Sequence, residues 1–195
     1  MIYFVRDARS EIFRAMGIFR FQAGPSSLKG NESMTEDTST LTVFYKGWHD
    51  YQTLLTKAIA PLTSDQLALS AAPGLRSIST IVRHIIGARA RWFHDMMGVG
   101  NQEFAKLGQW DRQGAAEREV AELVSGLETS WRVMQEALAS WTPADMQQSY
   151  KNDPGDEPEI FTRQWVIWHL IEHDLHHGGE VSLTLGMHSL AAPDL

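Results

Sequence analysis

The 195-residue sequence contains no cysteine, which excludes disulfide bonds, thiolate metal ligands and a cysteine nucleophile supplied by the protein itself. Any bound metal would therefore need histidine or carboxylate ligands. No apolar stretch approaches the roughly 20 residues of a membrane-spanning helix. The opening MIYFVRDARSEIF also carries charges where a signal peptide would be apolar. We therefore expect no membrane association and a cytoplasmic location.

Basic residues are the second shortage, because the formal net charge is -7 at pH 7. Residues 1–33 hold five basic and three acidic side chains, so the remaining residues carry 12 basic against 21 acidic ones. A surface of that sign repels phosphate backbones. Nucleic acid is therefore not expected as a partner.

A polar segment near the N-terminus predicts a domain boundary. Residues 23–40, AGPSSLKGNESMTEDTST, are rich in small and helix-breaking residues and predict a linker. The preceding apolar residues predict one short amphipathic helix; alternatively, Met34 is the physiological start and residues 1–33 lie upstream of the protein. We expect residues 1–40 to form an extension and linker, 41–188 a single domain, and 189–195 a C-terminal tail.

Four segments of the expected domain have apolar residues three and four positions apart, which is the pattern of amphipathic helices. They cover about 43–59, 78–97, 115–141 and 162–185, and Ser77 or Ser79 would cap the second one. The fourth segment is apolar almost all round, which predicts the most buried helix. Alternation with period two is missing, so we expect no sheet. The fold class is all-α, and a four-helix bundle is the simplest architecture.

Histidine is concentrated in the fourth helix. Four of the eight histidines lie within nine residues, at His169, His173, His176 and His177. At about 100° per residue they occupy an arc of about 100°, so all four are expected on one side of the helix, facing the interior. Two histidines four residues apart can both bind one divalent metal ion.

A third ligand is expected from His84, which lies among isoleucine and valine residues of the second helix. His84 precedes the end of that helix near Met97 by 13 residues, while His173 and His177 follow Phe161 by 12 and 16 residues. These positions reach the same depth of the bundle only if the second and fourth helices are antiparallel. An antiparallel arrangement of these two helices predicts a crossover in one of the long connections, 98–114 or 142–161. The alternative is that these histidines form hydrogen bonds in the core or line a polar groove.

Three stretches resemble the DinB/YfiT-like superfamily, whose members are regarded as metalloenzymes. They are GWHDYQTLL, HIIGARARW beginning at His84, and HLIEHDLHHGGEV beginning at His169. The resemblance covers about residues 41–188 and implies a four-helix bundle of unusual connectivity, frequently homodimeric. It also implies that the metal ligands are His84, His173 and His177. Gly178 departs from the family pattern, in which arginine is common at this position.

The resemblance also assigns the other polar residues of the last motif. His169 and His176 would lie beside the ligands or line a pocket, and three carboxylates would be partners of the histidines. These carboxylates are Glu172, Asp174 and Glu180.

The function expected from these features is metal-dependent chemistry on a small-molecule substrate. Three histidine ligands leave a coordination position open, as in catalytic sites. The better-understood branches of the family resemble thiol-dependent S-transferases and isomerases, so we expect a divalent metal, zinc or nickel, to activate a low-molecular-weight thiol toward an electrophile. One alternative is a metal-dependent hydrolase. The other is a non-catalytic, stress-associated bundle in which the histidines only affect stability.

Overall fold

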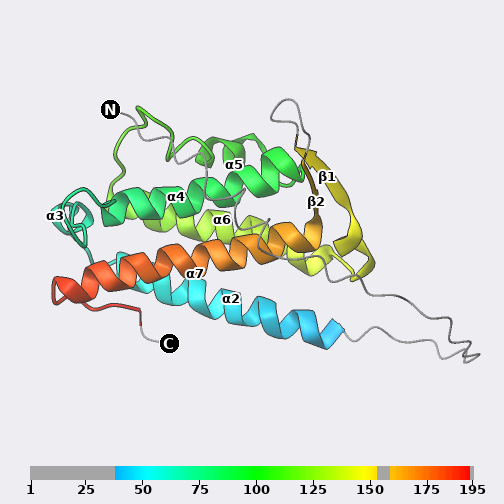
Figure 1. The fold of residues 1–195 in the computed structure, drawn as a ribbon, viewed down its shortest axis with the longest axis horizontal. Helices are drawn as coiled ribbons and strands as arrows, with labels where there is room; N and C mark the ends of the chain where they lie inside the picture. The colour runs from blue at the N-terminus through cyan, green and yellow to red at the C-terminus, as the bar shows by residue number, and fades with distance from the viewer. Residues whose placement is uncertain (1–37, 153–158, 194–195) are drawn as a thin grey trace, which may run out of the picture. The chain divides into compact units, whose positions relative to one another are not determined.

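The computed structural model describes residues 38–152 and 159–193. The expected N-terminal helix and the alternative start at Met34 lie outside these residues. The described residues belong to one compact unit, 36–195, and are mostly helical (Figure 1). In chain order the elements are α2 (Thr38–Ile59), α3 (Ser64–Leu67), α4 (Ile78–Ala90), the π-helical turn η1 (Arg91–Met96), α5 (Gln102–Leu107), α6 (Val120–Ser140), the 3-10 turn η2 (Ala144–Gln147), β1 (Ser149–Asn152), β2 (Glu159–Thr162) and α7 (Arg163–Met187).

The all-α class is confirmed, with α2, α4, α6 and α7 as the long helices. Contacts define their directions. Arg76, just before α4, contacts Glu180 late in α7, whereas Trp92, just after α4, contacts Trp165 early in α7, so these two helices are antiparallel. Figure 1 shows α4 and α6 running in the same direction. The connection 97–119, which joins them and contains α5, runs back along the outer side of α4.

Local signals in the sequence explain where the helices begin. Ser77 caps α4 by accepting a hydrogen bond from the Thr80 amide, and Thr162 caps α7 by accepting one from the Trp165 amide. The third helix begins at Val120 and not at 115, because Glu119 and Glu122 form a reciprocal capping box there.

Two expectations about the architecture were wrong. The 142–161 connection contains an antiparallel hairpin, with Ser149 opposite Thr162, where no sheet was expected. Its strands have only four residues each, which is too short for a clear period-two pattern. The most buried long helix is α4, in which 11 of 13 residues are buried, and not α7. Helix α7 instead exposes Trp168 and Leu183 by 61% and 60%.

One buried polar network joins all four long helices. Asp174 of α7 and Arg89 of α4 are both fully buried, and the Asp174 carboxylate accepts hydrogen bonds from Arg89 Nη2 at 2.7 Å and Nε at 3.0 Å. Trp48 of α2 donates to the same carboxylate at 2.7 Å, and Arg89 donates to Ser130 of α6 at 3.3 Å. Buried charges are tolerated only when paired in this way. The network therefore fixes how α4 and α7 lie against each other.

No helix in the described part of the chain is both long and apolar enough to cross a membrane.

Candidate metal centre

Three histidine rings converge between α4 and α7. His84 comes from α4, and His173 and His177 come from successive turns of α7. The ring centroids are 4.9 Å apart for His84 and His173, 4.8 Å for His84 and His177, and 4.4 Å for His173 and His177. One nitrogen from each ring lies within 4.8 Å of the others. The antiparallel helices thus bring together the three histidines that the sequence singled out.

Carboxylates determine which ring nitrogen of two histidines carries the proton. His84 Nδ1 lies 2.7 Å from Asp111 Oδ2, and His177 Nδ1 lies 2.7 Å from Glu180 Oε2. An ionised carboxylate only accepts hydrogen bonds, so each Nδ1 is the donor. In the neutral ring Nε2 then keeps its lone pair. This is the arrangement in which a carboxylate orients a metal-binding histidine.

The pKa values of His177 and Asp111 are shifted so that the His177 ring is neutral and the Asp111 carboxylate is charged. Burial lowers the pKa of His177 to about 4, against the opposing effect of its hydrogen bond to Glu180. Burial alone would raise the pKa of Asp111, but hydrogen bonds from His84 and Arg91 outweigh this and hold that pKa well below its usual value. At neutral pH His177 therefore has a free lone pair, and Asp111 is ionised.

Asp111 reaches the centre from the connection 97–119. Arg91 holds its carboxylate through contacts of 2.5 and 2.9 Å and also donates to the Gly108 carbonyl at 2.7 Å. Gly87 makes room for this approach, because a Cβ there would lie 2.7 Å from Asp111 Oδ1. Sequence reasoning missed Asp111, since a residue in an irregular connection has no periodic signal.

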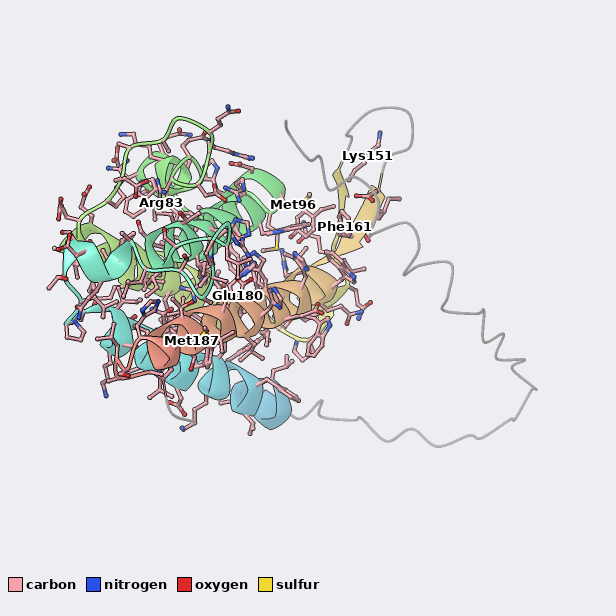
Figure 2. All side chains as sticks on the ribbon, turned by 60° about the vertical axis from the view of Figure 1, so that its left-hand side comes forward. Arg83, Met96, Lys151, Phe161, Glu180 and Met187 are labelled. Carbon is pink, nitrogen blue, oxygen red and sulfur yellow. The ribbon has the colours of Figure 1, made fainter. Side chains whose placement is uncertain are left out.

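Arg76 holds the Glu180 carboxylate as Arg91 holds that of Asp111. Its Nη2 lies 2.8 and 3.1 Å from the two Glu180 oxygens and 3.2 Å from His177 Nδ1. Arg76 is on the segment before α4, so its contact with α7 was not predictable from spacing. Figure 2 shows Glu180 on α7, which runs beside α4.

The donor set fits a divalent metal ion. His84 Nε2 and His173 Nε2 face each other at 3.1 Å. Because His84 Nδ1 donates to Asp111, the Nε2 of the neutral His84 ring presents its lone pair to the His173 ring, and one cation could bind the converging nitrogen atoms. Three neutral imidazoles suit zinc, nickel and related ions. The cluster could therefore hold a metal ion.

Comparison with known proteins agrees with the fold. A family model described as the DinB family matches residues 34–187. The chain belongs to the DinB family. No curated protein matches the sequence.

Solved structures show the same DinB-family fold. A DinB-like protein from Bacillus cereus has a TM-score of 0.62 at 19% identity, covering 78% of this chain and 95% of that one. A conserved protein from Enterococcus faecalis has a TM-score of 0.55 at 12% identity, covering 74% and 96%. At these identities the likeness concerns the fold alone.

The remaining residues of the last DinB-family motif have separate environments. His176 is 66% exposed, so the expectation that all four histidines face the interior was wrong for this one. His169 stacks on Trp165, with its ring centroid 6.0 Å from that of His173. Glu180 is confirmed as a carboxylate partner of His177. Asp174 belongs to the Arg89 network and also lies 3.9 Å from His173 Nδ1, whereas Glu172 is exposed.

Gly178 leaves room for a side chain of α2. A Cβ at this position would overlap the Tyr51 hydroxyl group of α2. Tyr51 also donates to the Leu175 carbonyl at 3.5 Å. The aromatic ring of α2 therefore fills the space that a longer side chain at 178 would need.

Proposed function

We propose that His84, His173 and His177 bind one divalent metal ion, zinc or nickel, and that the protein is a metal-dependent transferase. Its substrates would be a low-molecular-weight thiol and a small electrophile. The observation that carries this proposal is the convergence of three imidazoles between α4 and α7, two of them oriented by carboxylates. Each carboxylate is held in turn by an arginine.

A divalent ion held by His84, His173 and His177 would lower the pKa of a thiol or water bound to it. Residues of the chain orient the metal ligands. Asp111 and Glu180 fix the ring orientations and hold the proton on each Nδ1. Because the sequence has no cysteine, the thiol must be external. In the transfer a sulfur–carbon bond forms, the leaving group departs with its bonding electrons, and the thiol proton passes to solvent.

The test is a conjugation assay with bacillithiol, mycothiol and glutathione on metal-loaded and metal-free protein. We expect turnover with at least one thiol, dependent on metal and abolished in His84→Ala. His94→Ala is the matched control, because His94 pairs with Asp95 and lies outside the three-histidine cluster. Equal rates with and without metal for every thiol would contradict the proposal.

A metal-dependent hydrolase is the second candidate, because the same open site would ionise a bound water. It requires turnover of ester or amide substrates without thiol and loss of that turnover in His84→Ala. Turnover of this kind, without any thiol transfer, would replace the first proposal.

We further propose a homodimer, a domain spanning residues 41–188 and a cytoplasmic location, where small thiols stay reduced. An apolar groove of about 450 Å³ between α2 and α7 supports the dimer. Phe44 and Trp168 line it, and each is 61% exposed. Light scattering should report twice the 22.0 kDa chain mass and a monomer for Phe44→Asp. A monomeric parent at micromolar concentration would contradict the dimer.

A further inference from the structure

A column of aromatic rings leads along α7 to the histidine cluster. Phe161, Trp165, His169 and His173 follow one another at intervals of four residues. Phe161 and Trp165 stack with centroids 4.4 Å apart and planes at 26°, and Trp165 and His169 stack at 5.0 Å and 9°. His169 is then 6.0 Å from His173. In Figure 2, Phe161 marks the hairpin end of this stretch, and Glu180 lies on α7 beyond its other end.

Trp92 borders this column from the α4 side. Its ring meets Phe161 at 5.6 Å and 84°, Trp165 at 5.7 Å and 58°, and His169 at 5.1 Å and 66°. Trp92 belongs to the π-helical turn Arg91–Met96. Such turns are rare and occur frequently at functional sites. The residue before it, Arg91, holds the carboxylate that orients His84.

These rings are not closed into the core. Trp92, Phe161, Trp165 and His169 are all partly exposed, whereas Val166 of α7 is fully buried. Partly exposed ring surface is apolar area in contact with water, and covering it with an apolar ligand is favourable. We define Trp92, Phe161, Trp165 and His169 as the aromatic wall.

We propose that the aromatic wall binds the aromatic ring of the substrate and brings the electrophilic carbon of its side chain next to His173. This inference rests on the proposed thiol transfer and names its substrate class, planar aromatic electrophiles. Stacked and edge-to-face ring pairs favour a planar ring over a saturated ring of similar size. With an aryl-substituted alkyl bromide, the sulfur–carbon bond forms as the carbon–bromine bond breaks, bromide leaves with the electron pair, and the thiol proton goes to solvent.

Binding is tested on metal-free protein with an unreactive planar probe, 1,3-dinitrobenzene. The indole N–H signals of the seven tryptophans are followed by NMR. The signals of Trp92 and Trp165 are identified by their absence in Trp92→Leu and Trp165→Leu. These two signals should shift when the probe is added to the parent. Trp165→Leu should weaken binding about tenfold, and Trp165→Phe should retain it. Trp168→Leu is the matched control, because Trp168 lies on the same helix but lines the α2–α7 groove.

The parent spectrum alone decides the question if Trp165→Leu fails to fold. Shifts at Trp168 only, or no shift at all, would overturn the proposal. Far-ultraviolet circular dichroism checks that each variant retains the parent's helix content.

A turnover assay distinguishes the proposal of the aromatic wall from the proposal of thiol transfer. Metal-loaded protein and the active thiol are given 2-phenylethyl bromide or 2-cyclohexylethyl bromide, which have the same reacting carbon. Relative to the uncatalysed rates, kcat/KM should favour the phenyl compound about tenfold, and Trp165→Leu should remove this preference. Equal use of both bromides without probe binding would overturn the aromatic wall and leave thiol transfer standing. Probe binding at Trp92 and Trp165 without any transfer would support the wall and contradict the proposed function.

Discussion

Replacing Arg89 by methionine should destabilise the protein strongly. Arg89 and Asp174 have no exposed side-chain surface, and three of the four hydrogen-bond contacts to the Asp174 carboxylate come from Arg89. In Arg89→Met the buried carboxylate would keep only the Trp48 indole as a donor. Leaving a buried charge uncompensated typically costs about 3–5 kcal/mol. For a chain of this size that loss corresponds to a fall in Tm of roughly 10 °C.

Urea unfolding followed by circular dichroism measures this loss. Arg132→Met is the control, because Arg132 pairs with Glu136 on the exposed side of α6 and its removal should cause no measurable change. The double variant Arg89→Met, Asp174→Leu should recover much of the lost stability, since it removes both charges. A loss below about 1 kcal/mol for Arg89→Met would refute the reasoning about the buried pair.

Three further predictions concern the surroundings of the metal centre. Asp111→Asn should weaken metal binding about 10- to 100-fold because it removes the carboxylate that orients His84; competition with a chromophoric chelator measures this, and unchanged affinity would count against the orienting role. Gly87→Ala should weaken binding in the same assay without removing any ligand, because its Cβ would displace the Asp111 carboxylate; normal affinity would show that the carboxylate can move freely. Gly178→Ala should lower the free energy of unfolding by about 1–3 kcal/mol through overpacking against Tyr51, and Tyr51→Leu in the same chain should relieve part of this loss.

Much of the fold was predictable because helical periodicity is repeated over long segments. The approach of His84 to the α7 histidines also followed from the sequence, because distances to the helix ends fix depth once two helices are antiparallel. His176 was misplaced because it lies at the edge of the histidine arc, about 60° from His173. A small change in helix rotation decides whether such a residue faces the core or the solvent.

The supporting residues were beyond the reach of pattern analysis. Asp111 and Arg76 lie in connections, where no period relates sequence position to direction, so only the path of the chain brings them to His84 and Glu180. Asp174 does lie beside a ligand histidine, because its Oδ1 is 3.9 Å from His173 Nδ1. Its hydrogen bonds to Arg89 and Trp48 were not predictable, because no sequence spacing relates these residues to it.

The central claim is that His84, His173 and His177 form one metal site, and metal analysis of untagged protein by plasma mass spectrometry tests it most directly. The parent should contain about one zinc or nickel ion per chain, and His84→Ala, His173→Ala and His177→Ala should each lose it while His176→Ala retains it. A parent that stays metal-free even after reconstitution would contradict the account and favour a non-catalytic bundle in which these histidines only form hydrogen bonds.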